Sequence, residues 1–387
     1  MRKLFIALVL LVLVGLVVFL SVPAVLDKRM NSVELAPPYT AGAAARALHD
    51  KLFIADLHDD ALLWSRDLLT RNDYGHSDLP RLQAGHVGLQ VFSAVTKTPR
   101  NMNFERNAAD SDNITLLVIA QRWPMRTWNS LLQRALYQSE RLHEAAAHSA
   151  GAIRIVRTQS DLAEVLKAQS ANSGRLAAVL ATEGLHPLEG KLDNVDRLYD
   201  AGFRITGLTH FFDNEIGGSA HGMDKGGLTP FGRQVIARLE EKKMLVDLAH
   251  ASPQLIDDVL AIAKRPLLVS HTGVKGTCPG PRNLSDAHLK AIAATGGVIG
   301  IAYFQGAACG LTAADIIKAM QHAIAVAGVK HVALGSDFDG AIRVAFDTTG
   351  LMLLTQGLLQ AGLSESDIAD IMGGNVRRLL LENLPAQ

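Results

Sequence analysis

Short apolar runs alternate with amphipathic stretches along most of the chain, a pattern typical of strands followed by helices. The expected strands are Leu52–Asp60, Val87–Val95, Leu176–Gly184, Phe203–His210, Met244–His250, Pro266–Gly273, Gly296–Phe304 and His331–Gly340. Most are apolar without a break, as parallel strands buried on both faces are. The expected helices between them include Asp193–Ala201, Thr229–Lys242, Gln254–Ala263, Asp286–Ala294 and Ala313–Ala327. Eight such strands predict an α/β fold, a closed (β/α)8 TIM-type barrel rather than an open sheet.

One long interruption breaks this alternation. An insertion of about residues 96–175 separates the second and third strands, and it contains a long expected helix, Thr127–His148. No Gly-rich phosphate loop follows the first strand, so a dinucleotide-binding Rossmann fold is excluded.

The N-terminus carries an apolar stretch, Leu4–Leu26, behind the basic pair Arg2 and Lys3. As a helix this stretch is about 34 Å long, enough to span a bilayer. The basic pair should stay in the cytoplasm, which places the rest of the chain on the extracytoplasmic side. The alternative is a cleaved signal peptide, whose apolar region is normally only about 7 to 15 residues long. Pro23 also makes Ser21–Ala24 a poor cleavage site.

Composition adds limits to this picture. The 38 basic and 38 acidic residues cancel, so nothing in the charge points to nucleic acid as a partner. Only two cysteines are present, which excludes a disulfide scaffold and a cysteine-rich zinc site. We therefore expect a transmembrane anchor or signal at residues 1–26, a linker and entry helix at 27–50, and one barrel domain at 51–387.

Six of the eight expected strands end on residues that bind metal or move protons. These residues are His58 and Asp60, Glu183, His210, His250, His271, and Asp337 with Asp339. The carboxyl ends of barrel strands meet at one mouth, where active sites of this fold form. The sequence therefore predicts one site that gathers these side chains. Asp56, two residues before His58, either supports this site or is purely structural.

The predicted site favours metal-assisted hydrolysis. Imidazole and carboxylate ligands without thiolate suit zinc, or less often manganese, iron or cobalt. The candidates are too numerous for one tetrahedral ion, and two ions that share a bridging carboxylate account for them better. In such a pair, a metal-bound water becomes hydroxide and attacks a carbonyl carbon or a phosphorus.

The motifs around these residues resemble those of the membrane dipeptidase family, also called renal dipeptidases. They are Asp56-Leu57-His58-Asp59-Asp60, Thr182-Glu183-Gly184, Leu208-Thr209-His210, Asp247-Leu248-Ala249-His250, Ser270-His271, Pro281-Arg282-Asn283 and Gly335-Ser336-Asp337-Phe338-Asp339-Gly340. The resemblance runs from about Leu52 to near the C-terminus. It implies a zinc-dependent metallopeptidase that hydrolyses dipeptides with a hydroxide bridging two zinc ions.

The resemblance also implies a ligand set. By position, His58 and Asp60 would hold one zinc, and His250 and His271 would hold the other. Glu183 would bridge the two ions.

Three further residues receive roles from the same resemblance. His210 would bind the substrate and polarise the scissile carbonyl or stabilise the oxyanion. Arg282 would grip the terminal carboxylate of a short peptide substrate. Asp337 would orient the attacking water and pass its proton to the leaving amine.

Members of this family are often dimers, so the resemblance allows a homodimer, although no surface stripe in the sequence indicates one. The spacing of Cys278 four residues before Arg282 resembles that of a disulfide-forming cysteine in mammalian relatives. In an extracytoplasmic domain we expect Cys278 to pair with Cys309, and the alternative is two free buried thiols. A second enzyme hypothesis keeps the metals but changes the substrate to an N-acyl amino acid, a lactone or a β-lactam. A third is a binding protein without activity, which the complete ligand set disfavours.

Overall fold

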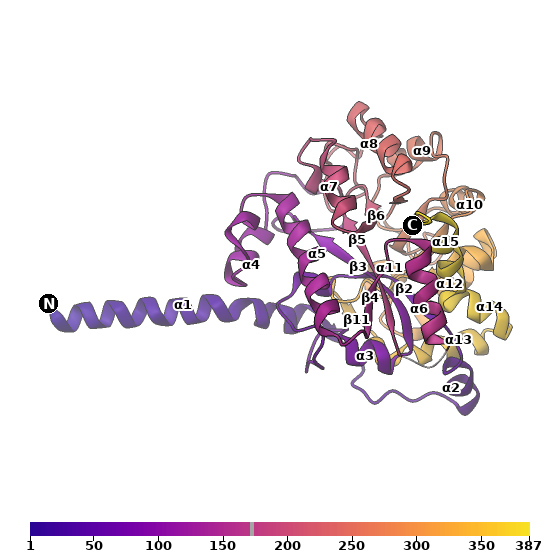
Figure 1. The fold of residues 1–387 in the computed structure, drawn as a ribbon, viewed down its shortest axis with the longest axis horizontal. Coiled ribbons are helices and arrows are strands. Elements are labelled where there is room, and N and C mark those ends of the chain that lie inside the picture. The colour runs from indigo at the N-terminus through magenta and orange to yellow at the C-terminus, as the bar shows by residue number, and fades with distance from the viewer. Residues whose placement is uncertain (171–173) are drawn as a thin grey trace.

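The computed structural model describes residues 1–170 and 174–387, and eight of its parallel strands close into a barrel. Figure 1 shows this barrel surrounded by helices. The barrel strands are β2 (Ile54–Asp59), β3 (Val87–Val95), β5 (Leu176–Glu183), β6 (Phe203–Gly207), β7 (Leu245–Asp247), β8 (Leu268–Thr272), β9 (Val298–Ile301) and β10 (Val332–Leu334). Pairing of β3 with β5, from Leu89 with Ala177 to Val95 with Glu183, closes the ring. The predicted (β/α)8 fold is therefore confirmed.

Helices follow most of the strands and cover the outside of the barrel. They include α3 (Leu79–Ala84), α7 (Asn194–Asp200), α8 (Pro230–Glu241), α9 (Pro253–Leu260), α10 (Asp286–Ala294), α12 (Ala313–Ala327), α13 (Met352–Gln360), α14 (Glu365–Ala369) and α15 (Asn375–Asn383). Several begin at a side-chain cap. The Thr229 hydroxyl accepts from the Gly232 N–H at 2.9 Å, and the Ser252 hydroxyl accepts from the Leu255 N–H at 3.0 Å. Such caps satisfy N–H groups that the first helical turn leaves unpaired.

The apolar core has two layers. One cluster gathers residues from all eight barrel strands, such as Leu89 of β3 and Leu268 of β8, together with α15. The other joins strand residues to the surrounding helices, such as Val235 of α8 and Leu289 of α10. The first cluster fills the barrel interior and the second packs the helices onto its outer face, as expected for this fold.

The insertion between β3 and β5 is mainly helical. It contains α4 (Ile114–Ala120), α5 (Leu131–His148), α6 (Gln159–Gln169) and the short strand β4 (Ile153–Ile155). Ser130 caps α5, so the helix begins four residues later than the sequence predicts. Within the described residues, strand β4 pairs with β5 alone and lies outside the closed ring.

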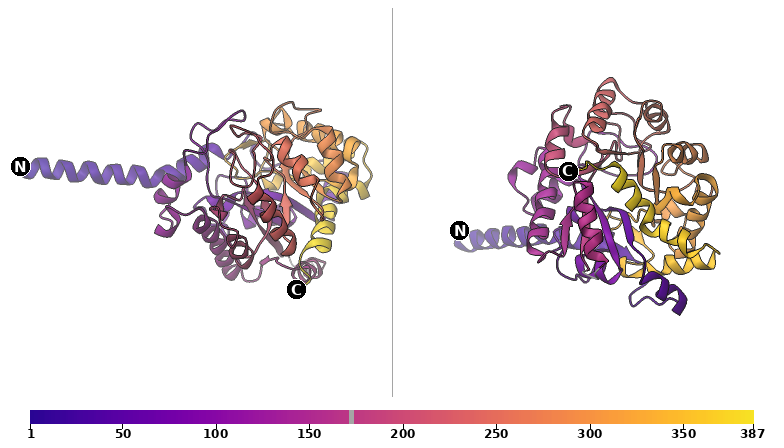
Figure 2. Two further views of the ribbon diagram at one scale, coloured as in Figure 1. Left: turned by 90° about the horizontal axis from the view of Figure 1, so that it is seen from above. Right: turned by 45° about the vertical axis from the view of Figure 1, so that its right-hand side comes forward.

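The N-terminal helix α1 (Arg2–Met30) extends away from the barrel, as Figures 1 and 2 show. It is long and apolar enough to cross a membrane. Its inner end contacts α4, and the following strand β1 (Ser32–Val33) pairs with β11 (Arg343–Val344). The entry helix α2 (Ala43–His49) then packs on α13. The short helix α11 (Gln305–Ala308) follows β9 along the chain.

Candidate active site

One carboxylate oxygen stands at the centre of the predicted site. Glu183 Oε1, at the end of β5, lies 3.1 Å from His250 Nε2 and 3.3 Å from His210 Nε2. It also lies 3.5 Å from the Nε2 atoms of His271 and of His58. Four imidazoles from four different strand ends therefore converge on one buried carboxylate.

A second group of donors adjoins the first through His58. Its Nε2 lies 3.4 Å from Asp60 Oδ1 and 3.9 Å from Asp337 Oδ1. The donors form three overlapping groups in which the ligand atoms lie within 4.8 Å of one another. The groups are His58, Glu183 and His271; Glu183, His210 and His250; and His58, Asp60 and Asp337. The structure thus brings together seven of the eight imidazole and carboxylate residues predicted at the strand ends. The eighth, Asp339, is not among these donors and instead pairs with Arg66 Nη2 at 2.8 Å. His210, to which the resemblance gives a substrate role, lies as near Glu183 as the predicted histidine ligands do.

Local backbone irregularities aim these side chains. Register shifts interrupt β2 between Asp56 and Asp59 and β8 between Val269 and Thr272, beside the donors of those strands. Such irregularities re-aim a side chain where a strand ends. His250 has φ 62° and Asp337 has φ 63°, in the left-handed region. Residues with side chains rarely occupy this region, and those that do cluster at functional sites.

The electrostatics of the cluster fit a divalent metal. Burial and the neighbouring Asp60 raise the pKa of Glu183 well above its usual range. Burial and Arg282 lower the pKa of His250, which keeps its imidazole neutral, the form that binds metal. His58 Nε2 and Asp60 Oδ1 are buried without a hydrogen bond within the described residues. Converging carboxylates repel one another, and a divalent cation removes that repulsion.

Arg282 brings a positive charge to the same mouth. It is 5% exposed, and one of its Nη atoms donates to the His271 carbonyl at 2.9 Å. The next residue, Asn283, donates from its side-chain amide to the Cys278 carbonyl at 2.8 Å. Cys278 forms the expected disulfide with Cys309. The loop that presents Arg282 is therefore held by a hydrogen bond to β8, by a hydrogen bond within the loop, and by a disulfide to the segment after α11.

Asp56 is tied to the strand that leads to Asp337. Its carboxylate accepts from the Ser336 N–H at 2.8 Å and from the Ser336 hydroxyl at 2.6 Å. The side-chain amide of Gln90 also donates to it at 2.9 Å. Asp56 thus holds the residue next to Asp337 in place, which favours the supporting role over a purely structural one.

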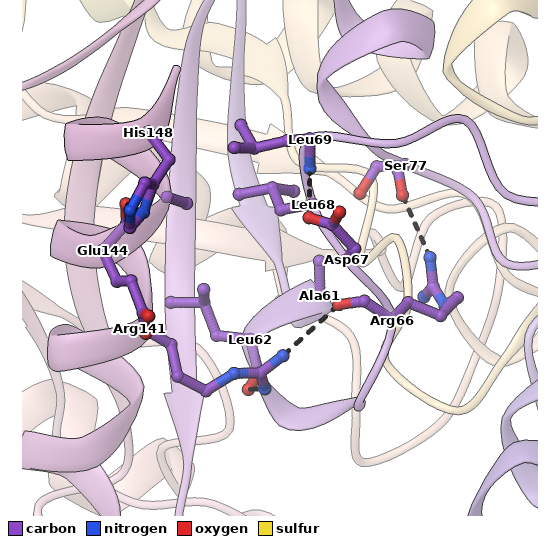
Figure 3. Close-up of a pocket in the computed structure, with 11 residues that line it drawn as sticks. Ala61, Leu62, Arg66, Asp67, Leu68, Leu69, Ser77, Arg141, Glu144 and His148 are labelled. Carbon is purple, nitrogen blue, oxygen red and sulfur yellow. Dashed lines mark hydrogen bonds between the residues drawn. The ribbon is translucent and has the colours of Figure 1, made fainter. Parts of the chain in front are cut away.

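A buried ion-pair network connects helix α1 to the loop after β10. Arg66 Nε pairs with Asp27 Oδ2 at 2.8 Å, and Arg66 Nη2 pairs with Asp339 Oδ1 at 2.8 Å. A further Arg66 N–H donates to the Ser77 carbonyl at 3.0 Å, as Figure 3 shows. The Asn31 side chain completes the link, because it donates to Asp27 at 2.9 Å and accepts from the Ala341 N–H at 2.8 Å.

The sequence did not reveal one wall of the site. The cavity above the donors has a volume of about 770 Å³, and it is lined in part by Phe19, Val22, Pro23, Leu26 and Met30 of α1. A helix apolar all round is read as lipid-facing, so no part of it was expected to line the site. The available signal was the spacing 19, 22, 23, 26 and 30, which places these residues on one helix face.

A closed (β/α)8 barrel with imidazole and carboxylate donors at the carboxyl ends of its strands defines a metal-dependent hydrolase of the barrel type. Comparison with known proteins narrows this class. Residues 42–384 match the family described as membrane dipeptidase, peptidase family M19. The chain therefore belongs to the membrane dipeptidase family.

Individual relatives agree with this assignment. The chain is 31% identical over 312 residues to the dipeptidase verJ of Clonostachys rogersoniana, an alignment that covers 79% of this chain and 75% of that protein. It is 27% identical over 348 residues to the dipeptidase aclJ of Aspergillus oryzae, an alignment that covers 84% of this chain and 77% of that protein.

Two solved structures share the fold. The probable dipeptidase PvdM from Pseudomonas aeruginosa has a TM-score of 0.73 at 18% identity, over 88% of this chain and 98% of that one. A metallo peptidase from Rhodobacter sphaeroides, liganded with a phosphinate mimic of the dipeptide L-Ala-D-Ala, has a TM-score of 0.67 at 23% identity. The match covers 86% of this chain and 99% of that one.

Proposed function

We propose that this chain is a dipeptidase that uses two zinc ions to hydrolyse the single peptide bond of a short peptide with a free carboxylate. The observation that carries the proposal is the convergence of four imidazoles on Glu183 Oε1, within 3.1 to 3.5 Å. This donor set is rich in imidazole and carboxylate and lacks thiolate, which suits zinc.

His58 and Asp60 would hold one ion, His250 and His271 would hold the other, and Glu183 would bridge them. Bound in this way, two zinc ions would activate a shared water as a bridging hydroxide and polarise the scissile carbonyl. Burial lowers the pKa values of His250 and His271, which supports their assignment, because a neutral imidazole needs no proton to leave before it binds metal.

The remaining residues would bind and orient the substrate and move its protons. A guanidinium has five N–H donors, so Arg282 keeps donors for a substrate carboxylate besides the one used by His271. His210, buried beside Glu183, would donate to the carbonyl oxygen as it gains negative charge. Asp337, at the rim of the donor cluster, would accept a proton from the attacking water and deliver it to the leaving amine.

The test uses the full-length chain in detergent, with metal content measured after dialysis and hydrolysis followed on L-L and L-D dipeptides. We expect two equivalents of zinc, hydrolysis that stops on chelation, and recovery when zinc is returned. N-Acetyl amino acids in the same panel separate a dipeptidase from a hydrolase of other amides. A protein without metal and without hydrolysis of any dipeptide would refute the proposal.

We propose in addition that α1 anchors the enzyme with its barrel on the extracytoplasmic side. Arg2 and Lys3 precede the apolar stretch, and basic residues are retained on the cytoplasmic side. The Cys278–Cys309 disulfide supports the same orientation, because disulfides persist in oxidising compartments. Alkaline phosphatase fused after Gln387 should be active, since that enzyme folds only outside the cytoplasm. An inactive but stable fusion would reverse the orientation.

A further inference from the structure

The substrate cavity reaches far beyond the metal donors. Its floor is formed by Asp60, Glu183, His210, His250, Arg282 and Asp337. Its volume of about 770 Å³ lies in the upper part of the range for drug-sized ligands, about 300 to 1,000 Å³. A dipeptide of two small residues would occupy the floor and leave the outer part unfilled.

The outer part of the cavity is apolar. Large side chains line it between the floor and α1, namely Trp64, Met102, Phe104, Leu116, Leu117 and Phe304. Phe104 and Phe304 stack with their ring centroids 6.1 Å apart. Met102, Phe104 and Leu116 are 42%, 39% and 58% exposed, although they are apolar. Apolar surface of this extent next to a reaction centre indicates an apolar ligand.

One face of helix α1 forms the wall of the cavity that lies farthest from the metal donors. Phe19, Val22, Leu26 and Met30 line the cavity and are 36% to 39% exposed, whereas Val25 is 62% exposed and does not line it. Three of the four, Phe19, Val22 and Leu26, belong to the last turns of the apolar stretch Leu4–Leu26. If that stretch spans the bilayer, these residues lie where the hydrocarbon layer ends. The cavity would therefore open at the membrane surface.

We propose that the preferred substrate is an amphipathic dipeptide, whose carboxylate pairs with Arg282 while a long linear apolar group lies against the α1 face. This inference rests on the proposed dipeptidase function and narrows its substrate class. The chemistry is unchanged: the oxygen of water bonds to the carbonyl carbon, the C–N bond breaks, and the leaving amine takes a proton. The products are two amino acids, one of which bears the apolar group.

The experiment measures kcat/KM with the full-length chain in phospholipid nanodiscs. One series of dipeptides pairs alanine with an amino-terminal residue whose linear side chain grows from one carbon to eight. A second series places the growing chain on the carboxyl-terminal residue. Full burial strengthens binding by about fourfold per CH₂, and half that free energy is about twofold. Over seven added carbons we expect kcat/KM to rise by about 100-fold in at least one series.

Two variants test whether the α1 face causes the preference for substrates with a long apolar chain. Leu26→Asn places a polar group on the cavity wall, and Val25→Asn makes the same change on the adjacent residue that faces away. We expect Leu26→Asn to lower the ratio of kcat/KM for the eight-carbon substrate to that for Ala-Ala by about tenfold. Val25→Asn should change this ratio less than twofold. An equal effect of the two variants would overturn the role of α1.

The outcomes distinguish this inference from the function on which it rests. Hydrolysis of Ala-Ala with no gain from chain length in either series would overturn the amphipathic substrate and leave the dipeptidase function standing. Failure to hydrolyse every dipeptide in both series would overturn both.

Discussion

Replacing Arg66 with methionine removes the one cation of the buried network between α1 and the loop after β10. The side chains of Arg66, Asp27 and Asp339 are 4%, 3% and 0% exposed, and both ion pairs are 2.8 Å long. Methionine keeps the length of the side chain and deletes the charge. The variant therefore leaves two carboxylates buried without their cation, and it tests how firmly α1 is joined to the loop that carries Asp337.

The expected loss follows from these contacts. Removing one partner of a buried ion pair costs about 3 to 5 kcal/mol. The pKa of Asp339 gives a second figure for the stabilisation by Arg66. Burial raises this pKa, but Arg66 and His76 outweigh burial and lower it to about 2. Relative to the ordinary value of 3.8, this depression corresponds to about 2 kcal/mol from Asp339 alone, whereas at Asp27 burial outweighs Arg66 and raises the pKa. Because the folded pKa is depressed, that stability is present above pH 3.8 and is lost as the pH falls toward 2.

Thermal unfolding of the full-length chain in detergent at neutral pH measures the loss. The chain outside the apolar N-terminal stretch has about 360 residues, each with an unfolding entropy of about 2.1 cal/mol/K. A loss of about 3 to 5 kcal/mol of stability therefore lowers Tm by about 4 to 7 °C. The matched control is Arg126→Met, which removes the exposed pair with Glu140 and should cost less than about 1 kcal/mol. Adding Asp27→Asn to Arg66→Met should recover part of the loss, because one unpaired charge disappears. An Arg66→Met protein with Tm within about 1 °C of the parent would refute the reasoning.

Three further variants test the site. Asp337→Asn should keep both metals, because Asp337 is not among the proposed ligands, and should lower kcat by about 100-fold or more; loss of metal on dialysis would mean that Asp337 is a ligand. Arg282→Ala should mainly raise KM for dipeptides, and an unchanged KM would contradict the carboxylate clamp. Cys278→Ser with Cys309→Ser opens a link between residues 31 apart, which should cost about 3 to 4 kcal/mol in thermal unfolding. The same double variant treated with a reductant is its control, since reductant should lower Tm only in the parent protein.

Patterns of apolar residues were enough to predict most of the barrel. The predicted bounds of β3, α10 and α12 agree with the structure, because each is a regular apolar or amphipathic run between clear ends. Some strands were predicted to extend too far at their carboxyl ends. Strand β7 ends at Asp247 rather than His250, and β10 ends at Leu334 rather than Gly340. His250 and Asp337 have left-handed backbones, so the chain leaves the extended conformation before it presents these side chains. Composition carries no signal for that turn.

The convergence of the donor side chains was predicted better than their surroundings. Strand ends of a barrel converge whatever the loops do, so the positions of Glu183 and His271 followed from the fold alone. The partners of Arg66 could not be predicted, because they lie 39 residues before it and 273 residues after it in the chain. Strand β4 was missed because Ile153-Arg154-Ile155 is too short a run to distinguish from a loop.

Helix α1 joins the catalytic domain in two physically separate ways, and the boundary between them falls near Leu26. Phe19, Val22 and Leu26 contribute apolar surface to the cavity but no polar contact to the barrel. Asp27 and Asn31 contribute the buried contacts to Arg66 and Ala341, and these contacts do not depend on the apolar span. Loss of the span would therefore remove the apolar wall and leave the link to the loop of Asp337 in place. If α1 anchors the chain in a membrane as proposed, the same helix also forms one wall of the cavity above the donors and is more than a tether.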